Sequence, residues 1–202
     1  MTRYRTIVAD PPWPLKWGGG GFRRGNSSWG RASYGRTTLG YKTMAVTEIE
    51  ALGVSALADR DAHLFLWAPD TFLIDGTAKR IAEAWGFKPG RILLFWAKPG
   101  FGLGHFPRPQ HEAILVCRRG KLPFRDALTI GSVQEWPQPY GPAGRSIAKI
   151  GSAKPDASLD LIERVSPGPY LELFARRQRL GWDTWGDEAL CHVNLVTSPE
   201  AE

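Results

Sequence analysis

The sequence of 202 residues has few cysteines and no long hydrophobic run. Its two cysteines, Cys117 and Cys191, have no Cys or His partners at metal-ligand spacing, so neither a disulfide scaffold nor a metal site is expected. The longest apolar runs, such as Ile92–Ala97, are far shorter than a membrane span. Residues Met1–Asp10 contain no long apolar core and no small-residue cleavage site, so no secretory signal is expected. These absences indicate a protein of the reducing cytoplasm with no membrane partner.

Positive charge and tryptophan are abundant instead. Lys and Arg number 26 against 20 Asp and Glu, which gives a formal net charge of +6 and favours a polyanionic partner. Nine Trp side chains supply planar rings of the kind that stack on nucleic-acid bases. A basic protein with a Trp-rich core has the same composition. Composition alone therefore leaves both interpretations open.

The hydrophobic pattern predicts strands that alternate with helices. Short, nearly continuous apolar runs predict strands at Tyr4–Ala9, His63–Trp67, Arg91–Ala97, Glu112–Cys117 and Tyr170–Phe174, with a short one near Leu128–Val133. Helices are expected from a capping box at Thr47–Glu50, over Asp70–Trp85, and over Asp156–Val165 after Pro155. The order predicts an α/β fold around a mainly parallel sheet, with one domain over residues 1–196 and a tail over 197–202.

Three polar residues follow predicted strands directly. Asp10 follows the first strand, Lys98 the third, and Arg176 comes shortly after the strand that begins at Tyr170. Ligands of such sheets bind at the carboxyl ends of the strands. We therefore expect a functional site where these residues meet.

The tetrapeptide Asp10-Pro11-Pro12-Trp13 offers the clearest chemistry at this expected site. Two prolines fix the backbone and remove two N–H donors, so the segment presents carbonyl acceptors held rigidly. Asp10 adds a carboxylate acceptor and Trp13 a flat ring. Acceptors beside a stacking surface suit a planar ring that carries an amino group, whose nitrogen would then be oriented to attack an electrophile. A strand ending covered by Trp13 is the plain structural alternative.

The DPPW motif resembles the catalytic motif of amino-group DNA and RNA methyltransferases. Further segments are similar, in order and spacing, to the MT-A70 family of S-adenosylmethionine-dependent adenine methyltransferases, and they span the chain from Val8 to about Glu188. These segments are Gly40–Met44, Leu64–Trp67, Phe95–Lys98, Arg108–Gly120, Ser152–Asp156, Ile162–Arg164, Glu172–Arg176 and Gly181–Glu188.

The resemblance implies a Rossmann-like methyltransferase fold with a permuted motif order, as in the β class, in which the catalytic motif comes first. It implies that Asp10 and the Pro11 carbonyl hold the target amine, that Trp13 stacks near the flipped adenine, and that Pro12 belongs to the same catalytic segment. It also implies an S-adenosylmethionine site that includes Asp10, with Lys154 at the cofactor carboxylate. The other cofactor residues implied are Glu172, Leu173, Phe174, Arg176, Asp187 and Glu188.

Two positions depart from the family pattern. Ala153 stands where His is common before the lysine, and Asp187 stands where Asn is common. A carboxylate in place of an amide donor reverses one hydrogen-bond direction, so cofactor affinity is the property these departures affect.

Substrate contacts are expected from loops around the pocket. The candidates are Arg23, Arg24, Arg31, Arg36, Tyr41, Lys98, Arg108, His111 and Glu112. The segment Gly100–Gly104 is not expected to be a cofactor loop, because the prolines that follow it cannot open a helix. Glu112 is expected to support the active-site loop.

The resemblance and the basic charge together predict methyl transfer to the 6-amino group of adenine in nucleic acid. DNA is the preferred substrate, because the compact chain is like small prokaryotic or phage-borne members, which would act in the cytoplasm of a prokaryotic or phage-infected cell. RNA adenine methylation and a catalytically silent, nucleic-acid-binding scaffold are the alternatives, and a small-molecule or protein amine is a third. Homo- or hetero-oligomeric assembly is left open.

Overall fold

The computed structural model describes residues 2–15, 42–100, 107–137 and 153–195. Its strands are β1 (Tyr4–Ala9), β2 (Ala58–Ala68), β3 (Lys88–Ala97), β4 (His111–Arg119), β5 (Val133–Gln134), β6 (Tyr170–Leu173) and β7 (Trp182–Trp185). Its α-helices are α1 (Val46–Glu50), α2 (Val54–Leu57), α3 (Asp70–Ile74), α4 (Thr77–Ala84) and α5 (Asp156–Val165), with a 3₁₀ turn at Ala127–Thr129.

The strands form one sheet in the order β5-β3-β4-β2-β1-β6-β7. β1 lies in the middle and pairs in parallel with β2 on one side and β6 on the other. β6 pairs with β7, and β3 with β5, also in parallel. β4 is the reversed strand, antiparallel to both β2 and β3. The predicted mainly parallel α/β sheet is therefore confirmed, with one antiparallel strand inserted in it.

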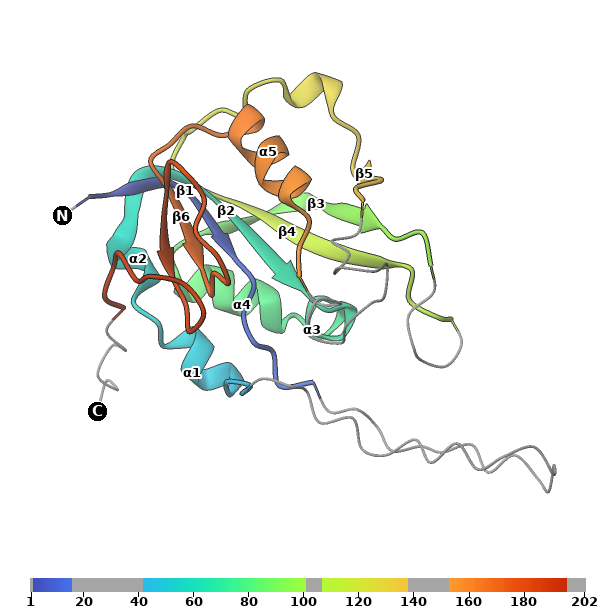
Figure 1. The fold of residues 1–202 in the computed structure, drawn as a ribbon, viewed down its shortest axis with the longest axis horizontal. Coiled ribbons are helices and arrows are strands. Elements are labelled where there is room, and N and C mark those ends of the chain that lie inside the picture. The colour runs from blue at the N-terminus through green and yellow to red at the C-terminus, as the bar shows by residue number, and fades with distance from the viewer. Residues whose placement is uncertain (1, 16–41, 101–106, 138–152, 196–202) are drawn as a thin grey trace.

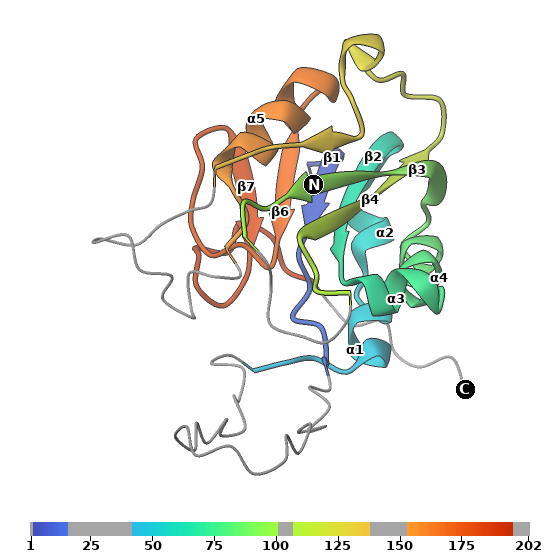
Figure 2. The ribbon, with the colours of Figure 1, turned by 90° about the vertical axis from the view of Figure 1, so that its right-hand side faces the viewer.

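Helices cover both faces of this sheet (Figure 1). Figure 2 shows α5 on one side and α2, α3 and α4 on the other. The alternation of side chains along β1 sends Ile7 and Ala9 into the core beneath α1 and α4, and Val8 into the core beneath α5. The α5 core is closed by Leu159 and Ile162 of the helix itself. Each helix layer thus has its own apolar contact with the sheet.

Tryptophan belongs largely to these cores. The five buried members in the described residues are Trp13, Trp67, Trp85, Trp96 and Trp182. The indole N–H of Trp85 donates to the Ile49 carbonyl at 3.1 Å, and that of Trp96 donates to the Trp136 carbonyl at 2.9 Å. For these five residues, the Trp-rich core is the interpretation that the structure supports.

Two expected helices differ from the structure. The helix predicted over Asp70–Trp85 is divided into α3 and α4 at Gly76, whose φ of +80° is unfavourable for other residues. The capping box predicted at Thr47–Glu50 is displaced by two residues, because Glu48 accepts the backbone N–H of Ala45 at 2.6 Å and Thr47 lies inside α1. The expected strand near Leu128–Val133 is reduced to β5, with the 3₁₀ turn before it.

Within the described residues, no helix is long and apolar enough to cross a membrane. No group of three or more metal-ligating side chains comes together in that same part of the chain.

Candidate active site

The site lies at the edge of the sheet where β1, β3 and β6 end. β1 is parallel to both β2 and β6. β3 runs in the same direction as β2, because both are antiparallel to β4. β4 is reversed, so its first residues reach this edge rather than its last. Asp10, Lys98 and Arg176 are thus brought to one edge from three strands, as the sequence predicts.

Asp10 is the centre of this edge. Its Oδ2 accepts a hydrogen bond from the ammonium of Lys154 at 2.7 Å, and both side chains are largely enclosed. Burial raises the pKa of the Asp10 carboxyl, against the opposing effect of the Lys154 ammonium. Burial disfavours the Lys154 ammonium, but the two carboxylates Asp10 and Glu112 outweigh it and raise its pKa. Lys154 therefore stays charged beside Asp10.

A pocket at this edge contains five of the predicted cofactor residues. Its lining includes Asp10, Lys154, Glu172, Phe174 and Arg176. These side chains come from the end of β1, from the segment before α5 and from β6 with the turn after it. The pocket brings together residues that are more than 140 positions apart in sequence, such as Asp10 and Lys154.

The backbone at Phe174 is unusual. Its φ is +61°, in the left-handed region that residues other than glycine rarely adopt. The turn is held by a hydrogen bond from the Ala175 N–H to the Trp185 carbonyl at 3.0 Å and by an edge-on contact between the Phe174 and Trp185 rings. Strained backbone of this kind is common at ligand sites, where surrounding contacts hold it in place.

Glu172 is the pocket's second carboxyl. Burial raises its pKa to about 7, and the nearby Asp10 and Asp156 carboxylates add to the rise against Arg177 and Arg179. Near neutral pH this side chain is therefore divided between its acid and carboxylate forms. Its acid form can donate a hydrogen bond to a ligand, and its carboxylate form can accept one.

Three predicted cofactor residues lie elsewhere. Leu173 is fully buried in the core on the other face of the sheet and does not line the pocket. Asp187 and Glu188 follow β7 in exposed positions and are also outside the lining. Their roles stay predictions, and the structure gives Leu173 a packing role.

The proline segment is anchored by its own carbonyls. The Pro11 carbonyl accepts the Trp13 N–H at 2.8 Å, and the Pro12 carbonyl accepts the Met44 N–H at 3.0 Å. The Trp13 ring is only 4% exposed, stacks on Phe72 at 4.8 Å and donates its indole N–H to the Trp67 carbonyl. In this conformation the ring offers no free face to a base, so stacking by Trp13 stays a prediction without geometric support.

Among the predicted substrate contacts, Glu112 and Lys98 lie beside the pocket, because Glu112 contacts the lining residue Lys154 and Lys98 contacts Glu112. Glu112 pairs with Lys98 through Oε1 and with Lys154 through Oε2, the latter at 3.2 Å. Although burial raises the pKa of the Glu112 carboxyl, these two ammonium groups reverse the effect and lower it. His111 contacts Asp70 at 2.9 Å, and Arg108 is exposed. Four arginines and a tyrosine lie outside the described residues: Arg23, Arg24, Arg31, Arg36 and Tyr41.

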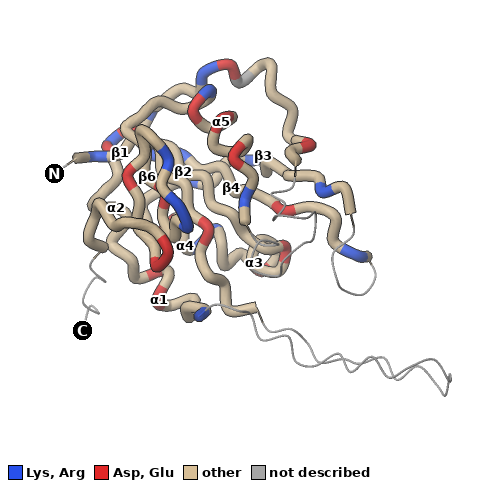
Figure 3. Tube along the Cα trace, viewed as in Figure 1, with Lys and Arg blue, Asp and Glu red and all other residues tan. Residues whose placement is uncertain are grey.

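The two arginines that follow Arg176 form ion pairs with α5. Arg177 lines the pocket and pairs with Asp156 at the start of α5. Arg179 pairs with Glu163 at 2.8 Å and Asp160 at 2.6 Å. Figure 3 shows acidic and basic positions interleaved along α5 and around β6. The signal that could have indicated this is the spacing of Asp156, Asp160 and Glu163 on one side of the helix.

Known proteins with similar sequences include methyltransferases. The sequence model of the MT-A70 family matches residues 4–100, which include β1, the DPPW segment and β3. The Type II methyltransferase M.MunI of Mycoplasma sp is 27% identical over 197 residues, which cover 92% of this chain and 78% of that protein. The mixed α/β sheet is consistent with a methyltransferase fold, while the permuted motif order remains an expectation. The family match over residues 4–100 and the long alignment together support an MT-A70 family methyltransferase.

Proposed function

We propose that this protein transfers a methyl group from S-adenosylmethionine to the 6-amino group of adenine in nucleic acid, with DNA as the preferred polymer. The observation that carries the proposal is the largely enclosed Asp10 carboxylate at the end of the central strand, in a pocket with Lys154, Glu172 and Arg176. The name of the relative M.MunI, a Type II methyltransferase, supports the reaction class. The net charge of +6 supports a polyanionic substrate.

The residues of the pocket fit the cofactor's functional groups. Lys154 and Arg176 would hold its carboxylate end and hydroxyl groups, as charge-assisted donors do. Glu172, with its pKa raised to about 7 by burial, would accept hydrogen bonds from hydroxyl or amino groups. Phe174 offers an apolar ring at the same wall. S-adenosylmethionine supplies a methyl group bound to a positively charged sulfur, a strong electrophile.

Asp10 and the Pro11 carbonyl would orient the target amine. Each accepts one N–H of the amino group, and the Pro11 carbonyl has a second lone pair beyond the one used by the Trp13 N–H. Held by two rigid acceptors, the nitrogen directs its lone pair at the methyl carbon. The N–C bond forms as the C–S bond breaks, with the bonding electrons passing to sulfur. The methylated nitrogen then loses one proton to solvent, which restores a neutral amine.

The target base must leave its stack to reach this edge. Extruding a paired base costs roughly a few kcal/mol, and an unpaired base costs less. The pocket's acceptors are at the sheet edge rather than on a groove-reading helix, which suits a flipped or single-stranded adenine.

The test is nucleoside mass spectrometry after incubation with deuterated S-adenosylmethionine. Duplex DNA, single-stranded DNA and RNA are compared in parallel, with Asp10→Ala beside the wild type. We expect labelled N6-methyladenine in DNA with the wild type and none with Asp10→Ala, which should still bind cofactor measurably. Label in RNA alone would replace DNA by RNA. Full activity in Asp10→Ala would overturn the mechanism, and no label anywhere would favour a silent scaffold.

A further inference from the structure

Four charged side chains form one continuous line across the pocket edge. Lys98 contacts Oε1 of Glu112, Oε2 of Glu112 lies 3.2 Å from Lys154, and Lys154 lies 2.7 Å from Oδ2 of Asp10. The four residues come from the ends of β1, β3 and β4 and from the segment before α5. Their side chains are 17 to 26% exposed, so solvent screens these contacts only partly.

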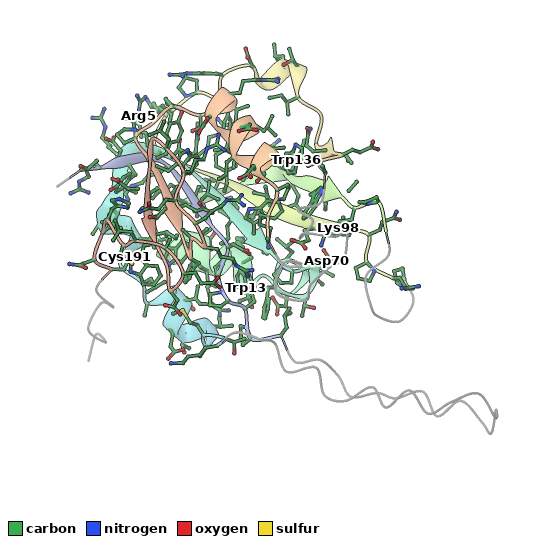
Figure 4. All side chains as sticks on the ribbon, viewed as in Figure 1. Arg5, Trp13, Asp70, Lys98, Trp136 and Cys191 are labelled. Carbon is green, nitrogen blue, oxygen red and sulfur yellow. The ribbon has the colours of Figure 1, made fainter. Side chains whose placement is uncertain are left out.

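The Lys98 side chain is largely enclosed, unlike that of a surface lysine that binds a phosphate. Its ammonium lies 4.8 Å from the centre of the Trp96 ring and is paired with Glu112. Its backbone N–H donates to the Gln110 carbonyl at 2.9 Å, which fixes the end of β3 next to the start of β4. Figure 4 shows Lys98 at the end of the sheet opposite Arg5. The enclosed position directs the charge of Lys98 at Glu112 rather than outward.

Glu112 is the shared element of this line, because its two oxygens serve two ammonium groups. A carboxylate that loses one of two cations binds the other more strongly. Lys154 has the same choice between two carboxylates, Glu112 and Asp10. A change at Lys98 therefore reaches Asp10 through two intervening groups, without any contact between Lys98 and Asp10 being required.

We propose that Lys98 is a positioning residue: through Glu112 it sets how firmly Lys154 is held at Asp10, and thereby the pH range in which Asp10 accepts the target amine. The clause on the amine rests on the proposed function, whereas the coupling itself does not. Lys98 touches neither cofactor nor base in this role. The role differs from the substrate contact that the sequence predicts for it.

The charged groups that face Asp10 come from several elements. Lys154 contacts it directly, Glu112 of β4 and Arg176 after β6 act on it through space, and Asp10 in turn acts on Glu172 of β6. Lys98→Met removes a positive charge and draws Lys154 towards Glu112, so the pKa of Asp10 should rise. Glu112→Gln removes a negative charge and leaves Lys154 to Asp10, so the pKa of Asp10 should fall.

The experiment is a carboxyl ¹³C NMR titration of the ligand-free protein labelled at aspartate, with the Asp10 signal identified by its loss in Asp10→Asn. We expect the pKa of Asp10 to change by about 0.5 or more, upward for Lys98→Met and downward for Glu112→Gln. Lys98→Arg should keep the wild-type titration, and Lys88→Met, an exposed change on the same strand, should do the same. Shifts of equal sign, or none in either variant, would overturn the proposal.

Enzyme kinetics provide the second reading. The acidic limb of the kcat/KM profile should move upward in pH for Lys98→Met and downward for Glu112→Gln. A purely structural role would lower kcat at every pH in both. If Lys98→Met does not fold, Glu112→Gln and Lys98→Arg decide the matter by the same NMR criterion. A wild type that transfers no methyl group contradicts the proposed function, while the titration still decides the coupling.

Discussion

The Lys154 ammonium lies 2.7 Å from one oxygen of Asp10 and 3.2 Å from an oxygen of Glu112. The same lysine is thus at once the counter-ion of the proposed catalytic carboxylate and the proposed ligand of the cofactor's carboxylate. Binding of cofactor and release of Asp10 are coupled through this one group.

Replacing Lys154 should therefore affect cofactor binding and stability together. In Lys154→Ala the Asp10 and Glu112 carboxylates lose their shared cation, and we expect the free energy of unfolding to fall by about 2 kcal/mol. The dissociation constant for S-adenosylmethionine should rise about 10- to 100-fold, the loss of one charge-assisted contact. Isothermal titration and urea denaturation measure the two effects. Lys121→Ala, at an exposed position, is the control, and an unchanged dissociation constant would remove Lys154 from the cofactor site.

His63 should make the fold sensitive to acid. It is fully buried, with Nε2 donating to the Leu122 carbonyl at 3.0 Å and Nδ1 accepting from the Ser166 hydroxyl at 2.7 Å. Burial lowers its pKa to about 4, below its ordinary 6.5. Between these values the unfolded chain binds the proton and the folded chain does not. Stability should therefore decrease by about 3 kcal/mol as pH falls from 6.5 towards 4.

The check is urea denaturation of the wild type and His63→Gln at several pH values between 4 and 7. Gln keeps a donor for the Leu122 carbonyl but does not titrate, so the dependence on pH should become shallower. His111→Gln, whose ring is 37% exposed, should leave it unchanged. An identical slope in wild type and His63→Gln would show that His63 is not the group responsible.

Glu172 should change stability with pH in the opposite direction, over a range that largely overlaps that of His63. Its folded pKa of about 7 lies above the ordinary 4.5, so the folded state binds more protons in this interval. The linkage relation then makes stability fall as pH rises from 4.5 to 7, by about 2 kcal/mol after allowance for its partial exposure. Glu172→Gln should abolish that fall and be more stable than the wild type at pH 8. The exposed Glu188→Gln serves as control, and a Glu172→Gln variant that is less stable at pH 8 would contradict the prediction.

Gly186 should be intolerant of any side chain. A Cβ there would lie 2.4 Å from the Ala175 carbonyl oxygen and 2.6 Å from its nitrogen, both backbone atoms that cannot move aside. Gly186→Ala should cost about 1–3 kcal/mol of stability. It should also weaken cofactor binding, because Ala175 lies between Phe174 and Arg176 of the pocket. Chemical denaturation and calorimetry test both, with Gly131→Ala as the control, since a Cβ at Gly131 would lie 3.9 Å from the Val133 carbonyl oxygen. Wild-type stability in Gly186→Ala would contradict the packing argument.

The sequence predicts elements whose boundaries are set by local chemistry. β1 and α5 have the predicted bounds, because prolines limit both: Pro11 follows β1 and Pro155 precedes α5. The sequence does not predict the break between α3 and α4 at Gly76, because the apolar period continues across it. β7 was missed because Trp182–Trp185 is short, and its pairing with β6 is a contact between distant segments.

The candidate site divides in the same way. The convergence of Asp10, Lys98 and Arg176 follows from strand direction, which a sequence pattern can indicate. The pairing of Glu112 with two lysines and the burial of Trp13 against Phe72 depend on how loops and helices pack. The sequence pattern alone does not predict these contacts.

The reversed direction of β4 has a consequence for how such a site can diversify. Antiparallel neighbours need no crossover helix between them, so β3 and β4 deliver Lys98 and Glu112 to the same edge without an intervening structural layer. Insertions between these two strands would lengthen the connection while the strand register still fixes both charges. The connection between the two strands can therefore differ in length without changing where Lys98 and Glu112 lie.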